Sequence, residues 1–380
     1  KAIAVTLLYA IAGTLAKSGR ITGSADKDKD VKNFEQNVLG IQPYSVKFGD
    51  KTYTYSWANP INAPLAIMAD TYQMSEEDAN AWDILRNGFS VAGNVLTENS
   101  FLQGISELFG QDSITEGLIQ SLESFPESMI PTLISQIASY TDDTRRQTYE
   151  YGNDFKTEAN KIKYKIPGAR NTLEPQVNTF GEEIENQNSF FNVFLNPANV
   201  REANVTEEQK ALYDVYKETK DKTIFPMQAP NYVPTDKGEK QNLSTSDKVK
   251  YQKASGQYVT DVYEDLFKSD NFQKESNEAK VKILHEIATD GNAKGKEAVG
   301  ASTTATNTDL SKLNEKIEIL EEADIPLADY YLAWYAKNNH AQGSTYAARQ
   351  KAIRDYTDLT PEQEEVLFGI FNIEYKKGSK

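Results

Sequence analysis

Residues suited to catalysis are scarce in this chain, which has two histidines and no cysteine. His285 is followed by Glu286, but position 289 is Thr. A metalloprotease helix needs a second His four residues after the first, so that both ligands face one metal ion. His340 lies near an expected helix end, where a cation is favoured by the helix dipole. We interpret both histidines as structural or surface residues.

Other catalytic patterns fail on spacing. The chain has no G-x-S-x-G element, and residues 291–296 lack the spacing and the preceding strand of a phosphate loop. Asp26, Asp28 and Asp30 alternate with lysines but are not followed by the Gly and Glu of a calcium loop. The absence of cysteine excludes disulfides and thiolate chemistry. We therefore expect no catalytic, cofactor-binding or metal-binding residue, and interpret the chain as a non-enzyme.

The net charge of −15 also limits the classes of partner that the chain can bind, because an acidic surface repels nucleic-acid phosphates. No specific nucleic-acid binding is expected. Apolar residues make up 39% of the 380 residues, below the usual share for a compact domain, although Tyr (21) and Phe (16) are well represented. This composition favours a folded protein with much surface, elongated or embedded in an assembly.

Four aromatic residues form the most distinct cluster in the C-terminal part: Tyr330, Tyr331, Trp334 and Tyr335. Their spacing of i, i+1, i+4 and i+5 predicts one helical stripe. Such a stripe suits an interface belt or a ligand platform, and packing in the core or against another subunit is the favoured interpretation.

The segment 40–72 predicts a small β-arm in a mostly helical chain. Residues 46–48 and 53–55 are short β-prone runs, and residues 49–52 are expected to form the turn between them. Trp57 follows, and an apolar run begins at Leu65. We expect Trp57 to be buried where the hairpin docks against the helix that starts at Leu65.

The first residues form an apolar run, residues 2–16, which predicts a helix too short for the roughly 20 residues that span a bilayer. Because the chain begins with Lys1, we expect a processed product or a piece of a longer chain. Two interpretations stay open: a buried bundle helix, or the end of a membrane-active segment that reaches a host membrane through residues 1–17. The residues that would carry either role are Ile3, Val5, Leu7, Leu8, Ile11 and Leu15.

Helical periodicity and capping residues recur along the rest of the chain. Residues 17–35 are expected to be a polar loop or arm, and residues 289–308 a loop. Segments 156–200 and 221–240 are rich in proline and glycine yet retain large apolar residues, so we expect ordered, extended chain there. Helices are expected over residues 65–140, 206–219, 246–268, 275–288, 310–323, 326–339 and from 361 onward.

The predicted fold class is therefore mainly α, elongated, with a small β-hairpin near residues 44–56 and long ordered extended segments. We divide the chain into four regions. These are an apolar helix with a polar arm (1–35), a hairpin with a helical core (36–155), an extended wrapping segment with one helix (156–240) and a C-terminal helical region (241–380).

Several stretches carry a resemblance to known proteins. IQPYSVKFGDKTYTYSWANPINAPLAIMAD resembles a segment that recurs in very large proteins of tailed bacteriophages, of the tape-measure, internal ejected or polyvalent type. Further segments resemble the same proteins and follow one another in the same order along the chain. They are residues 99–110, 128–150, 159–183, 190–200 and 330–337. The matched positions are fold-type residues, and no catalytic signature is among them.

The resemblance implies a structural role in a phage virion, as the C-terminal part of a tail tape-measure or DNA-ejection protein. Its partners would be copies of itself and other virion proteins. Its location would be the tail or the interior near the portal, and the host cell envelope after ejection. The alternative is a host-directed binding module released from a large polyvalent protein, which would be a stable monomer. An enzyme whose site leaves no motif is a third alternative.

Overall fold

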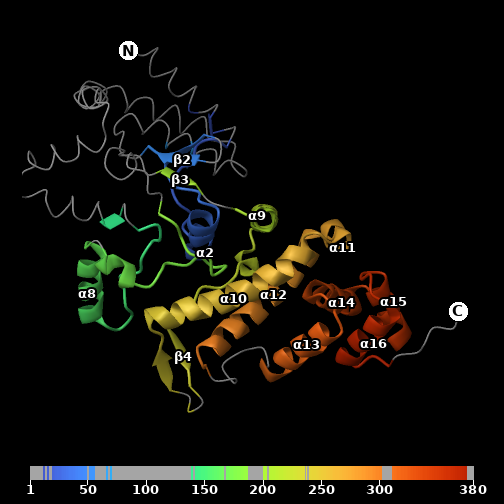
Figure 1. The fold of residues 1–380 in the computed structure, drawn as a ribbon. Coiled ribbons are helices and arrows are strands. Elements are labelled where there is room, and N and C mark those ends of the chain that lie inside the picture. Colours follow the sequence, from blue (N-terminus) through green and yellow to red (C-terminus); the bar gives the residue numbers. More distant parts are fainter. Residues whose placement is uncertain are drawn as a thin grey trace, which may run out of the picture.

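The computed structural model describes residues 19–48, 51–55, 142–166, 168–186, 200–202, 205–235, 239–301 and 310–374, with positions 12, 15–16, 66, 69–70, 138–139 and 237. These residues form a mainly α-helical fold, as predicted. Two long helices lie at its centre, the C-terminal helices gather beside them, and a helix of the segment 142–186 lies apart from that group (Figure 1).

The central pair is α10 (Thr245–Leu266) and α12 (Asn277–Ala298), with the short α11 (Asp270–Lys274) between them in sequence. The prediction of a loop from 289 is wrong, because α12 continues to Ala298. Its last turns carry Gly291 and Gly295, and a Cβ on either would come within 2.8 Å of Val259 or Tyr251 of α10. The low bulk of this stretch therefore permits close helix packing.

The C-terminal helices follow the expected order: α13 (Leu310–Glu322), α14 (Leu327–Asn339), α15 (Tyr346–Arg354) and α16 (Pro361–Ile370). The helix predicted from 361 onward is α16, which begins with a capping box between Thr360 and Gln363. Helix α15 was not predicted. Pro326 precedes the first turn of α14, as its sequence indicated.

The N-terminal part joins this core through α2 (Lys29–Asn33) and a π-helical turn, η1 (Phe34–Val38). The prediction of a polar arm over residues 17–35 is wrong here, because Val31 and Phe34 are buried in the main core. The ring of Phe34 stacks on Phe225 with centroids 4.2 Å apart. Two apolar residues three positions apart within a charged stretch are enough to anchor this helix.

Two small sheets complete the described fold. The predicted hairpin is confirmed as β1 (Ser45–Phe48) and β2 (Lys51–Thr54), and β3 (Val200–Glu202) pairs with β2 on the other side. Phe48 pairs with Lys51, so Lys51 and Thr52 are strand residues and not part of the turn. The second sheet is β4 (Tyr232–Pro234) with β5 (Lys240–Asn242).

Two further elements were predicted in part. Helix α9 (Glu207–Thr219) matches the predicted range and begins with a capping box, in which Thr206 and Gln209 bond reciprocally. A 3₁₀ turn, η5 (Lys222–Ile224), follows it.

The main core contains buried residues from all four predicted regions, at 31–38, 180, 212–225, 258–287 and 320–373. The division into those regions stays a prediction.

Residues 142–186 form a separate arrangement, which we call the polar module. It contains α8 (Asp154–Tyr164) and a 3₁₀ turn, η3 (Ala169–Thr172), so the prediction of extended chain from 156 is wrong for α8. Its flanking segments are extended, and three of them meet in a closed cycle of backbone hydrogen bonds. Arg145 N–H donates to Ile184, Ile184 to Gln176 and Gln176 to Arg145, at 2.7–2.9 Å.

Several predictions fall outside the described residues: Trp57, most of the helices over 65–140, and Ile3, Val5, Leu7, Leu8 and Ile11. Leu15 is helical and half-buried. In the described part of the chain, no helix is both long and apolar enough to cross a bilayer.

Candidate functional site

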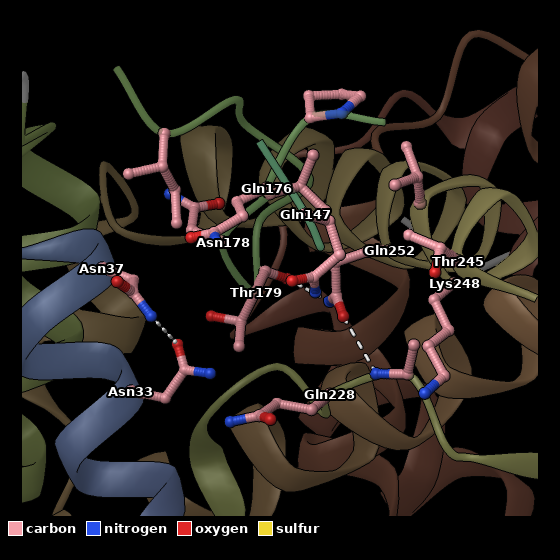
Figure 2. A pocket seen from close by; sticks show the side chains of 15 residues that line it. Asn33, Asn37, Gln147, Gln176, Asn178, Thr179, Gln228, Thr245, Lys248 and Gln252 are labelled. Carbon is pink, nitrogen blue, oxygen red and sulfur yellow. Dashed lines mark hydrogen bonds between the residues drawn. The ribbon is translucent and has the colours of Figure 1, made fainter. Parts of the chain in front are cut away.

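A pocket of about 270 Å³ lies where the polar module meets α10 and the N-terminal helix (Figure 2). Its described lining is dominated by neutral amide side chains, with a few hydroxyl and apolar residues. The lining residues are Asn33, Asn37, Gln147, Pro175, Gln176, Val177, Asn178, Thr179, Ile184, Gln228, Ala229, Thr245, Lys248, Val249 and Gln252.

Gln252 of α10 holds two other chain segments beside this pocket. Its side-chain amide donates to the carbonyl oxygens of Thr179 and Met227, and its oxygen accepts from Ala229 N–H at 3.0 Å. Asn178 acts similarly within its own turn, where its oxygen accepts from the N–H groups of Phe180 and Glu182. These amides are structural, because their hydrogen bonds are already made inside the protein.

Other lining groups keep free hydrogen-bonding capacity. Thr179 is 4% exposed, and its hydroxyl has no hydrogen-bond partner. The side chains of Gln147 and Gln228 form no hydrogen bond with another described residue. Both are drawn around the same opening in Figure 2. The pocket therefore offers amide donors and acceptors together with a buried hydroxyl.

Lys248 is the one charged residue among the described side chains of the lining. Burial lowers its pKa, and the nearby Glu150 opposes that effect. Its amine donates to Asn231 Oδ1 at 2.8 Å. No carboxylate is among these lining residues, so the pocket suits a neutral polar group and lacks an acid–base pair for bond cleavage.

A carboxylate stands just behind the pocket wall, at the start of α10. Glu150 accepts from the Thr245 N–H at 3.1 Å and from its hydroxyl at 2.7 Å. Lys156 lies 3.1 Å from the same carboxylate. Burial raises the pKa of Glu150, but the bonds from Thr245 and Lys156 outweigh that effect and hold the pKa below its usual value. Glu150 thereby fastens the polar module to α10.

A second cavity, of about 420 Å³, lies beside η1 and α9. Burial raises the pKa of its Glu35 carboxyl, although the Tyr213 hydroxyl donates to Glu35 Oε1 at 2.6 Å and opposes the shift. Gln42 also lines this cavity, and its side-chain nitrogen is buried without a partner. Sequence patterns missed this site, because Glu35 and Tyr213 are 178 positions apart.

The predicted aromatic stripe is on α14, and the structure places it against the core. Tyr330, Tyr331 and Tyr335 are buried, and Trp334 is half-buried against the same cluster. The Tyr331 hydroxyl lies 2.5 Å from that of Tyr258 and donates to Asp290 at 2.7 Å. The stripe therefore joins α14 to α10 and α12.

The two histidines lie on the surface of the described fold. His285 Nδ1 is 3.4 Å from the carbonyl oxygen of Thr223. His340 Nε2 lies 2.8 Å from the Tyr356 hydroxyl and 3.2 Å from Glu275. Within the described ranges, no three His, Asp or Glu side chains are arranged to hold a metal ion.

The comparisons with known proteins add no assignment. Neither the protein-family models nor the curated proteins nor the solved structures contain a match to this chain. The amide pocket could not have been found from the sequence either. Its residues come from several separated segments, and Asn and Gln there form no spaced motif.

Proposed function

We propose that this chain is a structural component of a phage virion, the C-terminal part of a tail tape-measure or DNA-ejection protein that assembles in copies in the tail or near the portal. The supporting observation is that its buried polar side chains make hydrogen bonds within the protein. In the polar module and around the pocket they hold extended segments to helices, as Gln252 and Glu150 do. Such fastening suits a part with a fixed shape.

The buried pair in the polar module supports the same proposal. Arg170 is fully buried and donates through Nε to Asp142 at 2.8 Å, while Arg146 donates to the same carboxylate. The Arg170 guanidinium also stacks 4.0 Å from the ring centre of Tyr164. Buried ion pairs contribute little net stability but penalise other arrangements of the chain. A subunit that is present in many copies in an assembly needs one fixed conformation.

The alternative is a host-directed binding module, and the amide pocket is the observation that favours it. The unpartnered Thr179 hydroxyl suits a neutral polar ligand, as do the side-chain amides of Gln147 and Gln228, which bond no other side chain or backbone group in the described part of the chain. A released module of this kind is expected to be monomeric, whereas a structural component is expected to form larger species.

The direct test is to quantify the chain in purified particles of the phage that encodes it, by mass spectrometry against known tail proteins. A structural component is expected at a fixed number of copies in each particle. Its absence from particles, together with its presence in infected cells, would replace this proposal with the released module. Sedimentation of the isolated chain gives the matching solution measurement.

The apolar run at residues 2–16 supports one further element of the proposal, which is contact with the host membrane during DNA delivery. Liposome leakage should be compared for the full chain and for a variant without residues 1–17. Greater leakage with the full chain is expected. Equal leakage would remove the membrane element and leave the structural role standing.

A further inference from the structure

Helix α8 of the polar module is oriented with its apolar side outward. Phe155 is 87% exposed and Ile162 is 62% exposed, whereas the polar Thr157 and Asn160 are buried at 6% and 9%. A helix on the surface of a protein ordinarily shows the reverse pattern. Its inward side is held by polar contacts, since the Thr157 hydroxyl accepts from Glu150 N–H at 2.9 Å.

The outward residues have the spacing of a coiled-coil seam. Phe155, the half-buried Ala159 and Ile162 follow one another at intervals of four and three residues. Ile166, 45% exposed, continues the interval of four just past the end of the helix. A strict alternation of four and three is the pattern of a narrow stripe that packs against one other helix, rather than against a broad core.

Charged residues flank this seam on both sides, at the positions that face a neighbour in a coiled coil. Glu158 stands on one side and Lys163 on the other. Glu158 pairs with Lys161 of its own helix at 2.6 Å. In a parallel pair of identical helices, the Glu158 carboxylate of each copy also comes within reach of Lys163 of the partner subunit. In an antiparallel pair, Lys156 of one copy would meet Lys163 of the other, which offsets any attraction between Glu158 and Lys165.

We infer that the α8 seam is a contact between two copies of this chain, packed in parallel through Phe155, Ala159, Ile162 and Ile166. The occupant is a second copy because the flanking charges complement themselves in this arrangement. The inference deepens the proposed function and rests on it only for assembly in copies.

The contact is small, because eleven helical residues span only about 16 Å. Stable interfaces bury roughly 1,200–2,000 Å², more than one such helix pair supplies. The isolated chain should therefore pair weakly and in proportion to its concentration. In an assembly, where other contacts hold the copies together, the local concentration makes a weak seam sufficient.

The absence of cysteine allows a direct test with single substitutions in the full chain. Ile162→Cys places a thiol on the seam, and Lys161→Cys places one beside it on an exposed, off-seam position. After mild oxidation of concentrated protein, Ile162→Cys is expected to form about tenfold more disulfide-linked dimer than Lys161→Cys, because a disulfide needs Cα atoms within about 7 Å. Circular dichroism and reactivity toward a thiol reagent confirm that both variants are folded and accessible.

Orientation is tested by mixing Phe155→Cys with Ile166→Cys. A parallel pair gives mainly homodimers of each variant, and predominance of the mixed dimer would overturn the parallel seam. Equal cross-linking of Ile162→Cys and Lys161→Cys would overturn the contact itself. A monomer in which the thiol of Ile162→Cys is unreactive, because another segment of the same chain covers it, would do the same. So would binding of the seam to anionic vesicles without cross-linking. Each readout uses the isolated chain, so its failure is distinct from absence of the chain from particles.

Discussion

The polar module and the helical core are held together by different forces. In residues 142–186, the buried side chains that hydrogen-bond between segments are charged or polar, with Arg170, Asp142 and Glu150 at the centre. Leu173, Phe180 and Ile184 are also buried there, and Phe180 packs into the main core. In the core around α10, α12 and α14, fully buried apolar and tyrosine side chains form one cluster. Hydrogen bonds and ion pairs depend on exact partners, whereas apolar packing depends on volume. The module should therefore lose stability when its carboxylates are protonated or its charges are removed, and the core when side-chain volume changes.

Among the variants that test this contrast, Arg170→Ala is expected to have the largest effect. It should lower the free energy of unfolding by about 3–4 kcal/mol. It leaves the buried Asp142 without one of its two guanidinium partners and removes the stacking on Tyr164. Urea unfolding measures the change. Arg146→Ala is the matched control and should cost less, because that side chain is 17% exposed. Equal losses would contradict the role given to burial.

Gly256→Ala tests the joint between the module and the core. A Cβ at this position on α10 would lie 2.0 Å from the carbonyl carbon of Phe180, which belongs to the module. The expected loss is about 2–3 kcal/mol, because backbone and not a flexible side chain must move. Gly369→Ala on α16 meets no atom within 4 Å and should instead stabilise by about 0.5–1 kcal/mol. A harmless Gly256→Ala would show that the two regions are not in close contact.

Asp329→Asn should sharpen the difference in pH response. Burial, with Asp265 and Asp358 nearby, raises the pKa of Asp329 from 3.8 to about 6. A raised acid pKa means that the folded state binds the proton more tightly than the unfolded state does. The contribution of Asp329 to the free energy of unfolding therefore falls as pH rises from 3.8 to about 6. At neutral pH the substitution should add roughly 1–2 kcal/mol, with no gain below pH 3.8. A gain independent of pH would point to another cause.

Thr179→Val is expected to have the smallest effect, a gain of about 1 kcal/mol, because the buried hydroxyl it removes has no partner. Thr157→Val is the control, since that hydroxyl accepts from Glu150 N–H and should cost about 1–2 kcal/mol when lost. Thermal unfolding of both variants gives the comparison. Destabilisation by Thr179→Val would mean that the hydroxyl is satisfied in solution.

Sequence patterns predicted the helical core better than the polar module. Apolar periodicity and capping boxes located α9, α13, α14 and α16, because local signals and packing agree there. Helix α12 was cut short because its glycines were interpreted as a loop, although they allow approach to Tyr251. Helix α8 was missed since its inward side is polar, and the apolar seam therefore carries no signal of a buried face.

The candidate pocket was beyond prediction for a related reason. Its amides become neighbours only after the polar module docks on α10, as in the contact of Gln252 with Thr179 across 73 positions. Within the described ranges, neither histidine belongs to a group of three side chains that could hold a metal ion, and the interpretation of both as structural or surface residues stays a prediction. Nothing in the spacing of Glu35 and Tyr213 indicated that a buried hydrogen bond would join them.

The most direct test of the contrast is amide hydrogen exchange during acidification, expressed as protection relative to the unfolded chain. The pKa values of Asp142 and Glu150 are held below their usual values by hydrogen bonds that outweigh burial. Their stabilisation is complete above 3.8 and 4.5 and is lost as pH falls through the lower folded values. We predict that amides of residues 142–186 lose protection before those of α10, α12 and α14, although Asp247 of α10 and Glu297 of α12 also have lowered pKa values. Simultaneous loss in both regions, or earlier loss in the helices, would contradict it.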